Sequence, residues 1–154
     1  MDKLQFIGLF VLGLIAGFFF GSIPLSSADI VVSPLTPTSR INQSDISVYR
    51  EYVQINIPNM QWAEIASTNS MLPVLNGATH VLQKEPTNPE ELVVGDIISY
   101  RVPSSEFRII HRIISINTDE DGWYAITKGD NNQIPDPEKV RFEQIERVLV
   151  AILY

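Results

Sequence analysis

The chain has 154 residues, of which 45% are hydrophobic and 19% are charged, and its net charge is −7 at pH 7. This length suits one ordinary domain with a short appendage, and the acidic balance offers no basic surface for a nucleic-acid partner. The chain has no cysteine and only two histidines. Disulfides, thiolate catalysis and cysteine-based zinc sites are therefore excluded.

An apolar run near the start of the chain predicts a membrane anchor. Residues 4–23, "LQFIGLFVLGLIAGFFFGSI", contain no charged side chain. A helix of this length, at about 1.5 Å rise per residue, spans roughly the 30 Å of a bilayer core. Two alternatives are a buried core helix and a cleavable signal peptide, for which Ser26 and Ala28 are small residues before a possible cut. We expect a retained single-pass helix, with the lipid bilayer as its partner.

The next segment, residues 24–48, is predicted to be a linker. It is rich in Ser, Thr, Pro and Asn and shows no sustained hydrophobic period. We therefore expect it to add nothing to a packed core.

From residue 49 onward the pattern favours β-strands. Val, Ile, Tyr and Phe dominate several short runs, as a half-buried pleated surface prefers. Asp121-Gly122 predicts a tight turn between two strands, and residues 89–93 one short helical turn. Strands are expected within 52–57, 62–67, 79–85, 93–102, 106–117, 122–129 and 145–154. The sequence thus predicts a mainly β domain over 49–154, on one N-terminal transmembrane helix.

Ser70 stands in "TNSMLP", directly after a strand-like run. Such a serine is an ordinary turn residue or a nucleophile presented where a strand ends. Pro73 favours neither alternative. It prevents a regular central strand from continuing, which fits a plain turn and a presented nucleophile equally well. A nucleophilic serine also needs a base and an orienting group elsewhere in the chain.

His111 lies in the apolar run "RIIHRII". Strand alternation puts it on one face with Phe107, Ile109 and Ile113, and puts Arg112 on the other face. It is either a satisfied core residue or, as a neutral imidazole, a group that can accept a proton.

Two aspartates, Asp130 and Asp136, lie in "ITKGDNNQIPDP". The stretch is typical of an Asx- and Pro-rich turn. A calcium loop is disfavoured because the central glycine and terminal glutamate of an EF-hand are missing. With Ser70 and His111, the chain offers serine, histidine and aspartate on separate β segments, which are the three groups of a hydrolytic triad.

Four motifs in one order resemble the signal peptidase I family, in its endoplasmic-reticulum and archaeal branch. "NSMLP" resembles the family's Ser-Met-x-Pro nucleophile box, and "VVGDIISY" resembles its Gly-Asp-Ile strand. "IIHRII" resembles the His-Arg box of that branch, and "TKGDNN" followed by Asp136 resembles the last box. The resemblance covers about residues 62–154. Asn69 and Arg147 stand where the family often has glycine.

The resemblance implies a fold, an activity and a location. The fold would be the mixed β fold of signal peptidases, which is similar to that of self-cleaving SOS-type repressors. The activity would be removal of signal peptides from secretory preproteins, without a metal or organic cofactor. The protein would lie in the cell membrane with its catalytic domain extracytoplasmic, and a translocon or accessory subunits stay open as partners.

The resemblance also implies roles for individual residues. Ser70 would be the nucleophile and His111 the general base. Asp136 matches the triad member, and Asp130 a supporting residue that could replace it in that role. The Thr68 hydroxyl and the Ser70 backbone N–H would form the oxyanion hole.

Two other functions are weighed against this one. A catalytically inactive, membrane-tethered β binding domain of the same fold is the alternative. A self-cleaving repressor is disfavoured, because those proteins use a lysine base and carry an N-terminal DNA-binding motif, which the apolar segment 4–23 cannot form.

Overall fold

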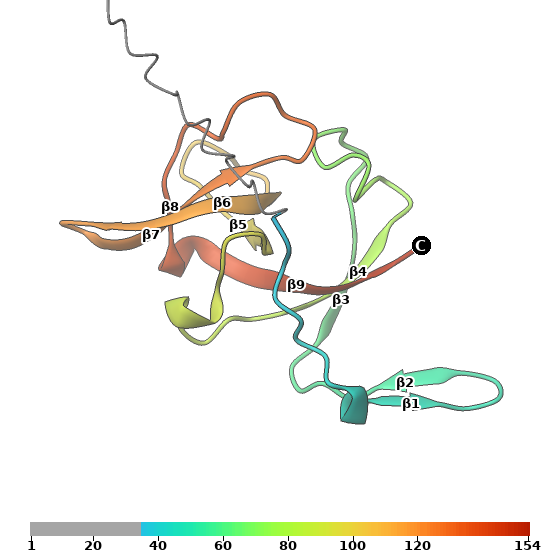
Figure 1. The fold of residues 1–154 in the computed structure, drawn as a ribbon. Coiled ribbons are helices and arrows are strands. Elements are labelled where there is room, and N and C mark those ends of the chain that lie inside the picture. Colours follow the sequence, from blue (N-terminus) through green and yellow to red (C-terminus); the bar gives the residue numbers. More distant parts are fainter. Residues whose placement is uncertain (1–34) are drawn as a thin grey trace, which may run out of the picture. The chain divides into compact units, whose positions relative to one another are not determined.

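The computed structural model describes residues 35–154, which fold mainly as β-structure (Figure 1). A two-stranded ribbon pairs β1 (Ile46–Val48) with β2 (Val53–Ile55). The other seven strands form one antiparallel sheet. They are β3 (Gln61–Glu64), β4 (His80–Lys84), β5 (Ile97–Tyr100), β6 (Ile109–Asp119), β7 (Gly122–Lys128), β8 (Val140–Arg141) and β9 (Ile145–Leu153).

Helical structure over 35–154 is limited to the 3-10 turns η1 (Gln43–Asp45), η2 (Pro89–Glu91) and η3 (Phe142–Gln144). The turn predicted at 89–93 is therefore confirmed. No helix within 35–154 is long and apolar enough to cross a membrane. The anchor predicted at 4–23 lies outside the described residues.

The larger sheet brings distant parts of the chain together. Its order is β3-β4-β9-β5-β6-β7-β8, so the last strand inserts between β4 and β5. Strand β6 lies between β5 and β7, and its register pairs Ile98 with His111 and Arg112 with Lys128. Strands β6 and β7 form a hairpin in which Asp119 pairs with Gly122, the first residue of β7, at φ +100°. The predicted hairpin is thus confirmed with its two turn residues, Glu120 and Asp121, one position earlier than expected, and the φ of residue 122 favours glycine.

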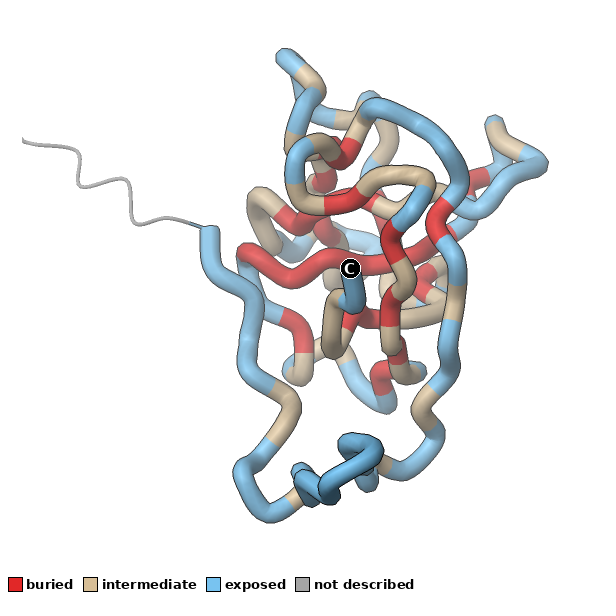
Figure 2. The backbone as a smooth tube through the Cα atoms, turned by 90° about the vertical axis from the view of Figure 1, so that its right-hand side faces the viewer, coloured by how far each residue is buried: buried red, intermediate tan, exposed pale blue. Residues whose placement is uncertain are grey.

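Two hydrophobic clusters form the core. Ile98 belongs to one and its neighbour Ile97 to the other, because successive residues of a strand point to opposite faces. Strand β6 follows the predicted alternation, with Ile109 and Ile113 against the first cluster and Ile110 against the second. Figure 2 shows buried residues along the larger sheet and exposed ones along the β1–β2 ribbon.

Part of the segment predicted to be linker packs against the domain. The Arg40 guanidinium forms an ion pair with Asp96, with an Nη2–Oδ2 distance of 2.7 Å. Their side chains are 6% and 0% exposed. The Thr38 backbone N–H also donates to Asp96 Oδ1, at 2.9 Å. Residues 38–40 of the predicted linker thus contact the domain through polar groups, because a buried carboxylate needs a partner, while none of them belongs to the two hydrophobic clusters.

Candidate active site

The serine of the nucleophile motif lies in a turn after β3 and is held by the loop that follows β7. The Ser70 carbonyl accepts a hydrogen bond from the Asn131 N–H at 2.8 Å, and the Asn69 carbonyl accepts one from Asn131 Nδ2 at 3.0 Å. A Cβ atom at Gly129 would lie 2.6 Å from the Ser70 carbonyl oxygen. Glycine at position 129 therefore lets the two segments approach closely.

The two groups predicted to form an oxyanion hole lie beside the Ser70 hydroxyl. Thr68 Oγ1 is 3.4 Å from Ser70 Oγ, at the exposed end of the turn. Over residues 35–154, no protein group accepts a hydrogen bond from the Ser70 backbone N–H. The Ser70 N–H is thus available to a ligand that approaches the serine, and the Thr68 hydroxyl lies next to the Ser70 hydroxyl.

The histidine of the His-Arg motif is bonded to one of the two candidate aspartates. His111 Nδ1 lies 2.7 Å from Asp136 Oδ2, and their side chains are largely buried. A carboxylate can only accept, so Nδ1 carries the proton in this pair. In the neutral imidazole this arrangement leaves the lone pair on the other ring nitrogen, Nε2, which is the arrangement that a general base requires.

Asp136 collects further hydrogen bonds on the same oxygen. The Thr127 hydroxyl donates to Oδ2 at 2.7 Å, and the Tyr100 hydroxyl donates at 2.9 Å. Burial raises the pKa of the Asp136 carboxyl, but the hydrogen bonds from His111, Thr127 and Tyr100 outweigh it and leave the pKa below its ordinary value. Asp136 is therefore an anion at neutral pH.

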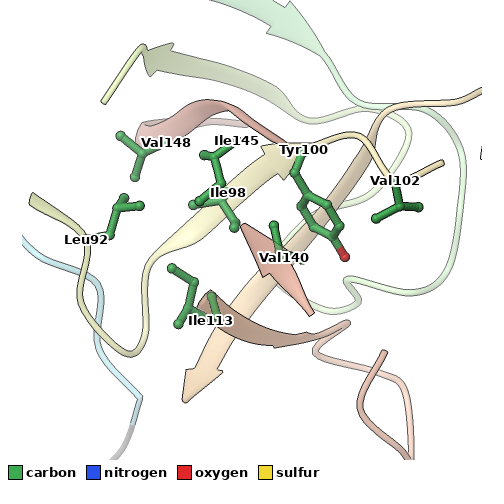
Figure 3. Close-up of a cluster of buried hydrophobic side chains, with 9 residues drawn as sticks. Leu92, Ile98, Tyr100, Val102, Ile113, Val140, Ile145 and Val148 are labelled. Atoms are coloured by element: carbon green, nitrogen blue, oxygen red, sulfur yellow. The ribbon is translucent and has the colours of Figure 1, made fainter. Parts of the chain in front are cut away.

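Tyr100 connects this carboxylate to the core. Figure 3 shows its ring among the buried side chains, with the hydroxyl oxygen at the edge of the cluster. Burial raises the pKa of the Tyr100 hydroxyl well above its usual value, and the nearby Asp136 charge adds to the increase. Tyr100 therefore stays protonated and acts as a hydrogen-bond donor.

The second candidate aspartate has a different partner. Asp130 accepts two hydrogen bonds from the Arg112 guanidinium, from Nε and Nη2, each at 2.7 Å. The same guanidinium donates from Nη1 to the Gly95 carbonyl at 2.7 Å. Asp130 thus belongs to a bidentate ion pair, which fixes its loop but leaves it apart from the imidazole.

The structure therefore brings the predicted residues together in two groups. His111 and Asp136 are directly bonded, and Thr68 lies beside Ser70. No hydrogen bond in the part of the chain described here joins Ser70 to His111. Such bonds are often long in ligand-free enzymes and tighten when substrate binds.

Sequence reasoning missed four contributors to this arrangement: Tyr100, Arg112, Thr127 and Asn131. Arg112 had a visible signal, because it follows His111 in the quoted motif. Tyr100 and Thr127 had none, since each is an ordinary strand residue until the strand register brings it beside Asp136.

The described residues thus contain two polar groups in a mainly β domain: a serine with Thr68 beside it, and a largely buried histidine–aspartate pair. Comparison with known proteins finds that the chain is similar, over part of its length, to signal peptidases. The chain is 48% identical over 44 residues to the signal peptidase complex catalytic subunit sec11 of Dictyostelium discoideum. This match covers 28% of this chain and 25% of the relative. It is also 35% identical over 78 residues to signal peptidase I W of Bacillus subtilis. That match covers 51% of this chain and 40% of the relative.

A third relative is the sec11 subunit of Schizosaccharomyces pombe, 31% identical over 64 residues, or 39% of this chain and 34% of the relative. The matches thus span between a quarter and two-fifths of these relatives. No family model and no solved structure matches the chain. The resemblance to signal peptidases is confirmed by these names.

Proposed function

We propose that this protein is a membrane-anchored serine endopeptidase that removes signal peptides from secretory preproteins. The observation that carries the proposal is the 2.7 Å hydrogen bond from His111 Nδ1 to Asp136. It accounts for a proton-accepting nitrogen in a chain that also carries a signal-peptidase-like serine motif. Similarity to named signal peptidases supports the choice of substrate.

In the proposed reaction the Ser70 hydroxyl attacks the scissile carbonyl. His111 Nε2 takes the hydroxyl proton as the new Oγ–C bond forms, and the imidazolium is stabilised by the Asp136 carboxylate. The proton then passes to the leaving amine as the C–N bond breaks. A water molecule, deprotonated by the same nitrogen, releases the acyl group and restores Ser70.

The developing oxyanion needs donors that are in place before the reaction. The Thr68 hydroxyl, 3.4 Å from Ser70 Oγ, and the Ser70 N–H are the proposed pair. Removing one such donor typically lowers kcat by about 100- to 1,000-fold. Thr68→Ala is therefore expected to leave a reduced but measurable rate.

The proposed location follows from the charge-free run at residues 4–23. A retained helix there would tether the peptidase domain to the bilayer, on the extracytoplasmic side where preproteins emerge. Full-length protein should then stay with membranes through carbonate extraction. Mature protein that begins after Ala28 would instead identify a cleaved signal.

Preprotein cleavage tests the proposed activity. Full-length wild type, Ser70→Ala and the matched control Ser47→Ala, an exposed serine of β1, are purified in detergent and incubated with a preprotein. Wild type and Ser47→Ala should release the signal peptide, while Ser70→Ala should not. Absence of cleavage by wild type would favour the alternative, a catalytically inactive binding domain of the same fold.

A further inference from the structure

A short segment before the first strand clamps the turn that leads into β5. We call residues 36–40 the N-terminal clasp. Arg40 donates from Nη2 to Asp96 Oδ2 and to the Glu91 carbonyl, each at 2.7 Å, and Thr38 donates its N–H to Asp96. The clasp backbone also approaches Gly95, where a Cβ atom would lie 2.5 Å from the Thr36 carbonyl oxygen.

This contact is specific. Gly95 has φ +107°, a conformation that side chains other than hydrogen rarely allow. The Asp96 side chain is fully buried, and besides the clasp it accepts a hydrogen bond from the Val93 N–H at 3.1 Å. Without Arg40 a buried carboxylate would lack its countercharge, so the clasp and the turn depend on each other.

The clamped turn is joined to the middle of β6. The Gly95 N–H donates to the Ile113 carbonyl, and the Ile113 N–H donates to the Asp96 carbonyl, each at 2.8 Å. The Gly95 carbonyl accepts from Arg112 Nη1 at 2.7 Å. Arg112 follows His111 directly, so the turn fixes the strand at the position of the proposed base.

From Arg112 the contacts continue to the serine. The Nε and Nη2 atoms of Arg112 donate to the two carboxylate oxygens of Asp130. The next residue, Asn131, donates its N–H to the Ser70 carbonyl at 2.8 Å, and the Asp130 N–H lies 3.4 Å from Met71 Sδ. One continuous set of polar contacts therefore runs from Arg40 to the backbone of Ser70.

We propose that Arg40 is a positioning residue for the Ser70–His111 site, acting through Gly95–Asp96, Arg112 and the loop 129–132. The proposal rests on the peptidase function proposed above. The clasp, which follows the predicted anchor in the chain, would then contribute to the geometry of the active site. A change in the contacts of the clasp would change the rate of the chemical step.

Three full-length variants separate positioning from simple stabilisation. Arg40→Lys keeps the charge but loses the planar fork that bonds Asp96 and the Glu91 carbonyl together. Arg40→Met removes the charge. Arg50→Met, at a side chain 93% exposed on the β1–β2 turn, is the control. All are compared with wild type in detergent, at a temperature where each is folded, by preprotein cleavage and by hydrogen exchange of residues 129–132.

We expect Arg40→Lys to lower kcat by about threefold to thirtyfold with KM nearly unchanged, the range of effects seen for residues that act through packed networks. Arg40→Met should lower it further and speed exchange at the Asn131 amide. Arg50→Met should change neither quantity. If Arg40→Met does not fold, Arg40→Lys decides on the same two readouts.

Unchanged kcat and unchanged exchange at 129–132 in a folded Arg40 variant would overturn the proposal. The exchange measurement does not need catalysis. If wild type cleaves nothing but Arg40→Met still speeds exchange at Asn131, the structural link stands while the peptidase function fails. If wild type cleaves and Arg40→Lys cleaves equally well, the function stands and the positioning role fails.

Discussion

Asp136 and Asp130 occupy two matched carboxylate sites on opposite faces of β6. Each lies 2.7 Å from its β6 partner, and the two side chains are 17% and 16% exposed. Their partners, His111 and Arg112, are consecutive residues and therefore point to opposite faces of the strand. Neither distance nor burial distinguishes the two carboxylates.

The difference lies in what each partner can do. A guanidinium stays protonated at any physiological pH, so the Arg112–Asp130 pair can fix a loop but cannot exchange a proton. An imidazole bonded at Nδ1 keeps Nε2 free for proton transfer. In the proposed function, one strand thus supplies a reactive pair, His111–Asp136, and a structural pair, Arg112–Asp130, and the two can be tested against each other.

The largest expected difference is in turnover after removal of each charge. Asp136→Asn should lower kcat by about 10,000-fold, because the amide favours the wrong imidazole tautomer and cannot stabilise the imidazolium. Asp130→Asn should have a much smaller effect, because Asp130 does not contact His111. Preprotein cleavage by the purified variants measures both. The reverse order would assign the triad role to Asp130.

The second expected difference is in stability. Asp130→Asn should lower the free energy of unfolding by about 1 to 3 kcal/mol, since Arg112 would lose a charged partner in a largely buried pair. Urea denaturation of the two Asn variants measures this quantity. Asp119→Asn is a useful control. Asp119 lies at the end of β6 and forms ion pairs with Lys139 and Arg141, not with Arg112. A stability of Asp130→Asn equal to wild type would contradict the structural role of Asp130.

A smaller effect is expected from the donors behind Asp136. Tyr100→Phe removes one of three hydrogen bonds to Oδ2 and keeps the ring in the core. The loss of one such bond should lower kcat by about tenfold, in line with roughly 1 kcal/mol for a hydrogen bond. Ser99→Ala, on the other face of β5, is the matched control. An unchanged rate for Tyr100→Phe would mean that Thr127 and His111 alone hold Asp136 in place.

The smallest effect is in the acid dependence of stability. The pKa of Asp136 is lowered in the folded chain, so its stabilising contribution is fully present above the unfolded value of about 3.9. That contribution disappears as pH falls through the lower folded pKa. Asp136→Asn should therefore lose less stability than wild type when the pH falls below about 4. Parallel urea curves at several acidic pH values test this, with the exposed Glu51→Gln as control.

The sequence predicted much of the β-structure because alternation and turn chemistry are local. The β6 faces and the Gly122 turn follow from neighbouring residues alone. Strands as short as β1 and β8 contain too few residues to show an alternation of polar and apolar side chains. The serine and histidine motifs could be picked out, but the sequence did not settle which aspartate meets His111. Asp130 and Asp136 lie in one loop, and only the packing of that loop against β6 separates them.

The contacts of the clasp also could not be predicted from the sequence. Arg40 stands in a polar segment whose composition is that of a linker, and its partner Asp96 is more than 50 residues away. No local pattern reveals a pair at that separation, because its geometry depends on the Gly95 turn and on the exact path of residues 36–40.

The proposed mechanism requires that His111, oriented by Asp136, makes Ser70 a nucleophile. Full-length wild type and His111→Ala are treated with a fluorophosphonate, digested, and analysed by mass spectrometry for the modified residue. The proposed mechanism predicts one adduct, on Ser70, in wild type and little or none in His111→Ala. An adduct on another serine, or equal labelling of Ser70 in both proteins, would contradict it.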